Sequence, residues 1–383
     1  MNKEKVSFGS IAIELGLTTH EHVMECIMIQ NQMRAMGIVP KMIGEIMLDK
    51  GFINEDGLRK IIYTQAQKEG RIQISGYKII QEIGRGAMGM VYKGMQLSLE
   101  RIVAIKVLSP RFAEDMKYVE RFLKEAKSVA RLNHQNIVQA IDAGISSGVY
   151  YFAMEFVDGP TLSYILRRGG AMDEKRALNI ITNIAMALQH FDKYGFVHRD
   201  IKPSNIMLTA GGGMAKLCDL GVAKVPVKKE GDESQQNVLV GTPNYISPEQ
   251  ARGEEVDIRS DIYSLGCTFY HAVTGEVPFK SENSMSVVMK HLYELVAPPR
   301  DKNSLVSGEI NDIILRMLAK NKAERYQKPE ELVMALEEAL KKQEAAFLQA
   351  EEDKNASQQR GKGKFPRVSP RRRGSSKSRR RLK

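Results

Sequence analysis

The stretch that decides the fold is His198-Arg199-Asp200-Ile201-Lys202-Pro203-Ser204-Asn205, followed by Asp219-Leu220-Gly221. An apolar run and a glycine turn at residues 211–213 separate the two halves, and this pattern predicts strand, turn, strand. Such a hairpin would bring Asn205 and Asp219 side by side. Two oxygen ligands presented together suit Mg²⁺, which binds through few protein groups plus substrate phosphates. Asp200 would then be placed to orient a hydroxyl nucleophile.

In this order and at this spacing, the two strings resemble the catalytic loop and metal-binding triplet of the eukaryotic-type protein kinase family, in its bacterial Ser/Thr form. Leu220 stands where Phe is commoner. The resemblance covers residues 77–337 and implies an α+β, two-lobed protein kinase fold with a small β-rich lobe and a large helical lobe. It also implies ATP and Mg²⁺ as cofactors.

The resemblance gives each motif residue a role. Asp200 would be the catalytic base, and Lys202 would reach the transferring γ-phosphate, which is the pattern of Ser/Thr-directed members. Asn205 and Asp219 would hold the metal. The activity implied is transfer of the ATP γ-phosphate to protein Ser and Thr hydroxyls, with autophosphorylation.

Upstream, a strand expected over residues 77–83 leads into a G-x-G-x-x-G string at residues 84–89. Alone this string could be a tight hairpin, because glycine adopts positive φ without steric cost. A strand follows it, not a helix, which favours a flap over phosphates rather than a dinucleotide-binding turn. The residues expected to bind ATP are Ile83, Gly84, Arg85, Gly86, Ala87, Met88, Gly89, Val91, Ala104, Lys106, Met154, Glu155 and Val157.

Lys106 lies inside an apolar strand, so it needs a partner or a ligand. The resemblance assigns it to the α- and β-phosphates, paired with an acidic residue on a helix expected over residues 118–132. Glu125 is favoured over Glu114 and Glu120, which fall nearer the start of that helix. The alternative for Glu125 is a surface pair on its own helix.

The hinge between the lobes is expected at residues 154–158. By resemblance, Met154 lies at the back of the adenine pocket, and backbone groups of Glu155 and Val157 bind the adenine edge. Cys218 is favoured as a small buried thiol without reactivity.

Residues 219–249 are interpreted as an activation loop, in which Thr242 resembles the substrate-proximal Thr. Ser234 is the single hydroxyl side chain over residues 222–240. Two hypotheses remain open for the loop. Either a phosphorylated Ser234 pairs with Arg199, or an unmodified acidic neighbour of Ser234 does so.

Three further residues have structural roles by resemblance. Glu249 should be buried and needs a cation, for which Arg325 is the expected partner. Asp261, in an apolar helical stretch, is the third.

An internal repeat precedes the kinase-like region. Residues 8–30 and 43–65 are copies of one unit, in which Gly9, Gly16, Val23, Ile27 and Gln30 recur as Gly44, Gly51, Leu58, Ile62 and Gln65. Each copy is predicted to be a short helix, a glycine turn, an N-cap (Thr19 or Asn54) and a second helix. One copy is too small to bury its apolar side alone, so the two should form one four-helix module over residues 1–67.

This repeat resembles the N-terminal domain of type II secretion and type IV pilus ATPases, some of which bind cyclic di-GMP through a twice-repeated motif. The nucleotide-binding copies open with Arg, whereas Ser7 and Met42 stand here. The missing guanidinium fork argues against cyclic di-GMP and favours a docking or dimerisation module. A pseudokinase scaffold and an adaptor for a secretion machine are the rival functions for the whole chain.

Charge is concentrated at the C-terminus. Residues 360–383 hold twelve Lys/Arg and no acidic residue, so without them the net charge of +11 falls to −1. We expect a linker over residues 68–76, a helical extension over 338–358 and a disordered basic tail over 359–383. The tail suits a polyanion, either nucleic acid or an anionic membrane surface, or it is only a solubilising extension. With no signal-type or membrane-spanning run, we expect a cytoplasmic protein.

Overall fold

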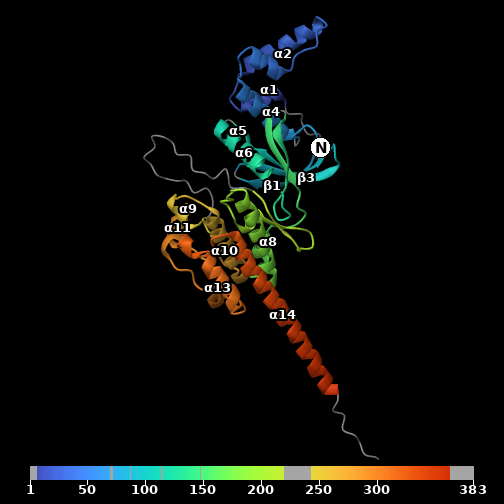
Figure 1. Cartoon of the computed structure of the whole chain (residues 1–383). Coiled ribbons are helices and arrows are strands. Elements are labelled where there is room, and N and C mark those ends of the chain that lie inside the picture. The colour runs from blue at the N-terminus through green and yellow to red at the C-terminus, as the bar shows by residue number, and fades with distance from the viewer. Residues whose placement is uncertain are drawn as a thin grey trace, which may run out of the picture.

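The computed structural model describes residues 7–69, 72–86, 88–113, 115–146, 148–219 and 243–362. They form a helical module, a small lobe built on a sheet and a large helical lobe, one after another along the chain (Figure 1). The α+β, two-lobed fold that the catalytic motifs predicted is confirmed.

The small lobe is a five-stranded antiparallel sheet in the order β1-β2-β3-β5-β4. Its strands are β1 (Tyr77–Gly86), β2 (Gly89–Gln96), β3 (Arg101–Leu108), β4 (Ala140–Ser146) and β5 (Val149–Glu155). Strands β3 and β5 are almost continuously apolar, as expected of strands covered on both faces. Lys106 is therefore the exception within β3, and its side chain must find a partner.

Helix α6 (Met116–Val129) follows the short helix α5 (Pro110–Ala113) and packs on the sheet. Asp115 caps α6 by accepting the backbone N–H of Lys117. The buried apolar residues of α6 recur every three or four positions and so line one face, and they are Val119, Phe122, Ala126 and Val129. Glu125 is buried on this helix as well, which calls for a compensating charge.

The large lobe is built around α8 (Glu174–Lys193), which packs beside α10 (Ile258–Thr274). The described residues of the lobe also form α7 (Leu162–Gly169), α9 (Pro248–Arg252), α11 (Ser284–Tyr293), α12 (Pro299–Lys302), α13 (Gly308–Met317), α14 (Pro329–Lys362) and the 3-10 turns η1 (Pro203–Asn205) and η3 (Lys322–Glu324).

A hairpin joins the lobes. Strands β6 (Ile206–Leu208) and β7 (Ala215–Leu217) pair antiparallel, with Ile206 opposite Leu217, so the strand-turn-strand prediction is confirmed. The backbone N–H of Val138 donates to the Leu217 carbonyl at 2.9 Å, which ties the hairpin to the chain between α6 and β4. One hydrophobic cluster runs through both lobes around this hairpin, so the catalytic motif sits on packed structure.

The N-terminal module consists of α1 (Phe8–Glu14), α2 (His20–Ala35), α3 (Ile43–Asp49) and α4 (Glu55–Glu69), which share one core. Each copy of the repeat is a short helix, a glycine turn and a longer helix. Gly16 and Gly51 have φ of 67° and 68°, where glycine is favoured. Thr19 and Asn54 accept backbone N–H groups at the starts of α2 and α4, as expected of caps.

The connection to the small lobe is packed rather than free. Within residues 68–76, where we expected a polar linker, α4 continues to Glu69 and both Ile72 and Ile74 are buried in the core of the sheet. The backbone N–H of Ser75 donates to Ser146 Oγ at 2.8 Å. The segment is polar on average, which is why we expected a linker, but its two isoleucines provide enough apolar surface to pack on the sheet.

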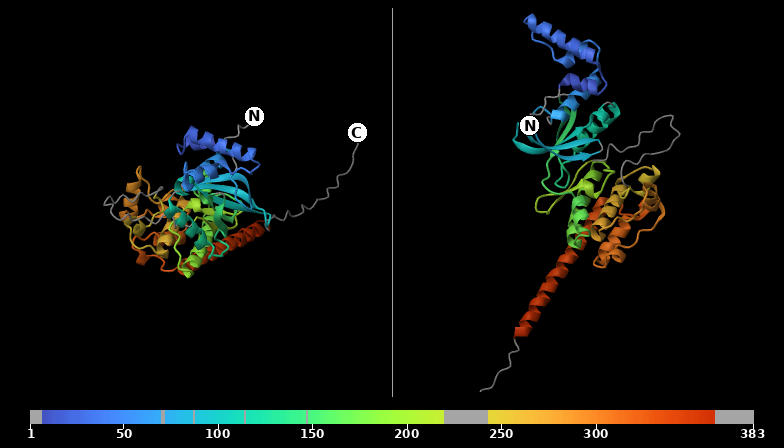
Figure 2. Two further views of the ribbon diagram at one scale, coloured as in Figure 1. Left: turned by 90° about the horizontal axis from the view of Figure 1, so that it is seen from above. Right: turned by 180° about the vertical axis from the view of Figure 1, so that it is seen from behind.

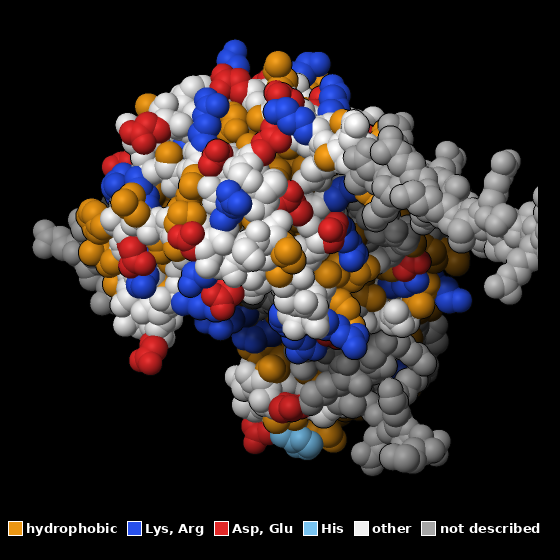
Figure 3. Space-filling model, turned by 90° about the horizontal axis from the view of Figure 1, so that it is seen from below, with side chains coloured by type: hydrophobic (Ala, Val, Ile, Leu, Met, Phe, Trp, Pro, Cys, Tyr) orange, Lys and Arg blue, Asp and Glu red, His pale blue; other side chains and the backbone are white. Residues whose placement is uncertain are grey.

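Helix α14 packs on α8 through its first half and then projects away from the large lobe (Figures 1 and 2). It runs to Lys362, past the boundary of 358 that we expected, and residues 363–383 lie outside the described part. Acidic and basic side chains are interspersed over the face seen in Figure 3, in keeping with the near-neutral charge of the chain outside its tail. Within the described residues, every helix is too short or too polar to traverse a bilayer.

Candidate active site

Three charged side chains from distant parts of the sequence meet between the lobes. Lys106 Nζ on β3 lies 3.3 Å from Glu125 Oε1 on α6 and 2.9 Å from Asp219 Oδ1, which follows β7. The Glu125 side chain is 4% exposed, whereas that of Asp219 is 47% exposed. The cluster is thus buried on the helix side and open to a ligand on the hairpin side.

Burial and mutual charge set the ionisation of this cluster. Burial raises the pKa of Glu125 to about 7, because the Lys106 charge offsets only part of the burial penalty. Burial would lower the pKa of Lys106, but the neighbouring carboxylates outweigh it and raise that pKa above its usual value. Burial also acts upward on the pKa of Asp219, yet Lys106 outweighs it and holds this pKa below its usual value. The Lys106–Asp219 pair is therefore charged at neutral pH, whereas the carboxyl group of Glu125 gains and loses its proton near neutral pH.

The catalytic loop holds Asp200 between two partners. Asp200 Oδ2 lies 2.9 Å from Lys202 Nζ and accepts a hydrogen bond from Asn205 Nδ2 at 3.0 Å. Asn205 Nδ2 also donates to the Asp200 carbonyl at 2.8 Å. The structure thus brings all three motif residues together, with the Asp200 carboxylate fixed in direction.

Asp261 supports a strained backbone in this loop. Arg199 has φ of 67°, in the left-handed region that non-glycine residues rarely adopt. The Asp261 carboxylate on α10 accepts the N–H groups of His198 at 2.6 Å and Arg199 at 2.8 Å. Burial raises the pKa of Asp261 to about 7 against the effect of these two bonds. The carboxylate lies directly behind the loop that it stabilises.

His198 connects the two halves of the motif, a role that the sequence did not predict. Its Nδ1 accepts the N–H of Asp200 at 3.3 Å, so Nε2 carries the proton and donates to the Cys218 carbonyl at 3.2 Å. Burial lowers the pKa of His198 to about 4, so the ring is neutral. Burial likewise raises the pKa of the Cys218 thiol, as expected of an unreactive cysteine. The position of His198 at the head of the motif was the only available signal.

The residues expected to hold Mg²⁺ present suitable donors. The backbone N–H of Cys218 donates to the Asn205 carbonyl at 2.9 Å, which places Asn205 beside the residue that precedes Asp219. Because Asn205 Nδ2 is directed at Asp200, its Oδ1 faces away, with a 3.4 Å contact to Ser204 Oγ. An amide oxygen and an ionised carboxylate are the hard oxygen ligands that Mg²⁺ takes. The described residues contain no cluster of three or more candidate ligands, and a magnesium completed by phosphates needs none.

The glycine turn lies against the end of β3. Residues 84–86 end β1 with Gly86 opposite Gly89, the first residue of β2. A Cβ on Gly89 would lie 1.8 Å from the Val107 carbonyl oxygen, so only glycine fits there. The N–H of Ser109 donates to the Met88 carbonyl at 2.8 Å. The other expected ATP-binding residues of the sheet are Ile83 on β1, Val91 on β2 and Ala104 on β3.

The hinge residues line the back of the site. Met154 and Val157 are buried, and Met154 lines a cavity between the lobes together with Glu125 and Asp219. Glu155 Oε1 lies 2.8 Å from Lys216 Nζ on β7, an ion pair that the sequence did not predict. A lysine within a short apolar strand was the signal available. The pair fastens the hinge to the hairpin that carries Asp219.

Glu249 and Arg325 form a buried bidentate pair. Arg325 Nη1 and Nη2 lie 2.7 and 2.9 Å from the two Glu249 oxygens. Ser260 Oγ also donates to Glu249, and Arg325 donates to the carbonyls of Ala319, Lys320 and Arg259. Burial acts to raise the pKa of Glu249, but Arg325 outweighs it and lowers that pKa. The pair joins α9 to the segment before α14.

Several expected residues lie outside the described part of the chain. They are Ala87 of the glycine turn, Leu220 and Gly221 of the triplet, and Ser234 and Thr242 of the activation loop.

The arrangement suits chemistry on a metal-bound polyphosphate. Lys106 and Asp219 offer an ammonium group and a carboxylate on one side. Asp200 offers a carboxylate, backed by a lysine ammonium, on the other. Such a site can hold phosphates in place and take a proton from a hydroxyl group.

Comparison with known proteins agrees with this geometry. Residues 77–341 match the family described as "Protein kinase domain". A probable serine/threonine-protein kinase of Clostridium perfringens is 37% identical over 272 residues, which are 71% of this chain and 39% of that protein. The serine/threonine-protein kinase PknB of Mycobacterium tuberculosis is 39% identical over 260 residues, 67% of this chain and 41% of PknB. The chain thus matches only about two fifths of the length of these relatives.

A solved structure is similar over the same region. The crystal structure of the Mycobacterium tuberculosis PknI kinase domain has a TM-score of 0.55 and 27% identity, and the match covers 70% of this chain and 97% of that one.

Proposed function

The chain belongs to the protein kinase domain family, and we propose that it is a Ser/Thr protein kinase that transfers the γ-phosphate of ATP to protein hydroxyls. One observation carries this proposal: Lys106 contacts both Glu125 on α6 and Asp219, which follows β7. At the same end of this hairpin, Asn205 donates to the Asp200 carboxylate. A scaffold that only bound nucleotide would not need the Asp200 carboxylate held by Lys202 and Asn205.

The proposed reaction follows from the placement of the loop. As the substrate hydroxyl oxygen bonds to the γ-phosphorus, Asp200 accepts the hydroxyl proton, which then passes to solvent. The bond from the γ-phosphorus to the bridging oxygen breaks, and ADP leaves with the electron pair. Lys202, 2.9 Å from Asp200, offers positive charge to the transferring group. Lys106 holds the remaining phosphates, and Glu125 orients Lys106.

Asn205 and Asp219 would hold Mg²⁺, which when bound neutralises charge on the phosphates. Glu155 and Val157 would offer backbone groups to the adenine, behind the glycine turn. These assignments rest on the donor set and on the position of each residue along the site.

Regulation of the site is proposed to involve the activation loop, of which residues 220–242 lie outside the described part of the chain. Phosphorylation of Ser234 would give Arg199 a strong anionic partner. Thr242 would lie near the acceptor hydroxyl. Gln250 Nε2 on α9, the residue after this loop, donates to the Arg199 carbonyl at 3.0 Å, so α9 contacts the catalytic motif.

The domain division is proposed as residues 1–67, 77–337 and a C-terminal extension. The N-terminal module is proposed to dock a protein or to dimerise, and its resemblance to secretion and pilus ATPases makes such a machine the candidate partner. The support is a group of exposed apolar side chains on α2 and the loop after it, namely Met24, Met28, Met36, Ile38, Val39 and Met42. Ser7 and Met42 in place of Arg continue to argue against cyclic di-GMP.

The basic tail is proposed to bind a polyanion. Its residues lie almost wholly outside the described part, so charge is the sole support. Affinity for a DNA duplex or for anionic vesicles that falls steeply with salt would agree with this role.

Product analysis tests the proposed activity. The purified chain is incubated with MgATP and a mixed peptide library, and phosphopeptides are identified by mass spectrometry. We expect phosphoserine and phosphothreonine, and no phosphopeptides from Lys202→Met. Binding of a fluorescent ATP analogue by Lys202→Met shows that this variant is folded. Phosphotyrosine as the main product would overturn the Ser/Thr assignment.

A further inference from the structure

The second repeat of the N-terminal module is built into the small lobe. Tyr63, on α4, is 5% exposed and belongs to a buried cluster with Ile74, Val107 and Val149. Val107 is the residue after Lys106, so this cluster reaches the strand that carries the active-site lysine.

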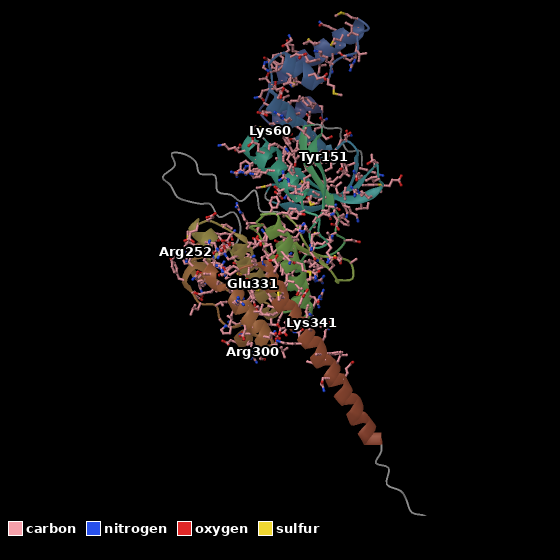
Figure 4. The ribbon with its side chains drawn as sticks, in the orientation of Figure 1. Lys60, Tyr151, Arg252, Arg300, Glu331 and Lys341 are labelled. Atoms are coloured by element: carbon pink, nitrogen blue, oxygen red, sulfur yellow. The ribbon has the colours of Figure 1, made fainter. Side chains whose placement is uncertain are left out.

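A second contact lies one turn earlier on α4. A Cβ added to Gly148, between β4 and β5, would lie 3.2 Å from Arg59 Cγ, so α4 approaches the sheet closely at this turn. Figure 4 marks Lys60 on this helix where it meets the small lobe, whose sheet carries Tyr151. Helix α4 therefore contacts the small lobe at a defined surface, which we call its seat.

The seat covers the chain that connects β3 to α6. Tyr63 and Arg59 line a shallow pocket with Leu108, Pro110 and Ala113, and α4 packs directly on α5. Leu108 ends β3, and α5 comes immediately before α6. The module thus touches the segment over residues 108–113 along its length.

This segment is connected to three parts of the site. Leu108 lies two residues after Lys106. Phe112 of α5 packs on Tyr118 of α6, with ring centroids 4.9 Å apart, and α6 carries Glu125. Ser109 is bonded to Met88 in the glycine turn. A displacement of the segment would therefore move the lysine, its glutamate and the phosphate flap relative to one another.

The internal repeat shows that this contact is particular to the second copy. The positions equivalent to Arg59 and Tyr63 in the first copy, 35 residues earlier, are Met24 and Met28. These side chains are 41% and 59% exposed, whereas Tyr63 is 5% exposed. The same helix face is buried on the lobe in one copy and open in the other.

We infer that the N-terminal module holds α6 in its catalytic position, with Tyr63 as the positioning residue that acts through residues 108–113 on the Lys106–Glu125 pair. This inference rests on the proposed kinase function for its catalytic consequence. A ligand that lifts α4 from its seat would slow transfer without touching the reacting groups.

Kinetics of the full chain test the inference. Tyr63→Ala should lower kcat by about 10- to 100-fold, because small misplacements of catalytic groups cost this much, while the dissociation constant for ATP changes much less. Tyr63→Phe, which keeps the buried ring, should restore kcat. Met28→Ala is the matched control and should behave as wild type. Equal loss of kcat in Tyr63→Ala and Met28→Ala would overturn the inference.

Hydrogen exchange provides a readout that needs no catalysis. Tyr63→Ala should increase amide exchange over residues 108–129, and Met28→Ala should not. If the wild type transfers no phosphate, the proposed function fails, and exchange over α6 still decides whether the module holds this helix. Unchanged exchange over residues 108–129 in a folded Tyr63→Ala protein, or increased exchange with kcat unchanged, overturns the positioning role.

Discussion

Two residues of the proposed site, Arg199 and Asp219, have positive φ values of 67° and 55°. Each such backbone conformation costs a non-glycine residue on the order of 1–3 kcal/mol, so the surrounding contacts must fix it. Asp261 fixes the first through two backbone hydrogen bonds, and Lys106 engages the side chain of the second at 2.9 Å. The strained backbone therefore lies next to the Asp200 carboxylate and at Asp219 itself, the two carboxylates whose direction the site depends on.

Asp261→Asn should disturb the first of these supports. An Asn side chain offers one acceptor oxygen, and its NH₂ would turn toward the N–H of His198 or Arg199. We expect a loss of about 1–3 kcal/mol in stability, the cost of an unsatisfied buried group, and a lower kcat with little change in KM for ATP. The control is Asp257→Asn, at the N-cap of the same helix, which should lower stability but leave kcat nearly unchanged.

The ionisation of Glu125 gives a pH-dependent prediction. Its folded pKa of about 7 lies above the ordinary Glu value of about 4.3, so its contribution to stability is full below the unfolded pKa and is lost as pH rises through 7. Glu125→Gln removes this titration. The melting temperature of the variant minus that of the wild type should therefore increase as the pH rises from about 5 to about 8.

Activity should move in the opposite direction. Wild-type kcat should rise over the same pH interval, because the ionised carboxylate orients Lys106, whereas the variant stays low throughout. Glu120→Gln, on the exposed side of α6, is the control for both measurements. A melting difference between Glu125→Gln and wild type that does not vary with pH contradicts the assignment.

At the scale of elements, the repeat glycines mark helix contacts. A Cβ on Gly9 would lie 2.5 Å from Val23 Cγ1, and one on Gly44 would lie 2.6 Å from Leu58 Cδ1. These glycine and apolar pairs recur in both copies because α1 crosses α2, and α3 crosses α4, at these points. The repeat in the sequence is thus a repeat of close helix packing.

Gly9→Ala should loosen the first copy. Valine is stiff at χ1, so overpacking against Val23 should cost about 1–3 kcal/mol. Amide exchange over α1 and α2 should increase, while exchange over α8 in the large lobe stays unchanged. Adding Val23→Ala removes the clash and should recover much of the protection. Unchanged exchange in Gly9→Ala would mean that the helices do not touch as described.

What the sequence could predict follows from how local each feature is. The hairpin and the helices of the repeat depend on local patterns, and both were predicted within a few residues. The apolar strand around Lys106 predicted only that this lysine needs a partner or a ligand, and the resemblance to protein kinases pointed to Glu125 as that partner. His198 and Lys216 bind groups that come close only in the folded chain, and no pattern pairs them. The burial of Ile72 and Ile74 was not predicted, because two isoleucines in a polar stretch are too few to show the hydrophobic periodicity of a helix or a strand.

At the scale of the whole molecule, the site lies between two lobes that share one core, and a third unit is seated on the smaller lobe. The residues of the proposed site come from β3, α6, the loop after α8 and the end of β7. Their alignment therefore depends on how the parts are held together. The seat of α4 on α5 makes the N-terminal module part of that support.

The most direct test of the account is the initial rate of ³²P transfer from γ-labelled ATP to a peptide acceptor by wild type and by Asp200→Asn. The account predicts transfer by the wild type and a loss on the order of 10²–10⁴ in the variant, the contribution of a positioned general base, with ATP binding retained. Equal rates in the two proteins would contradict it.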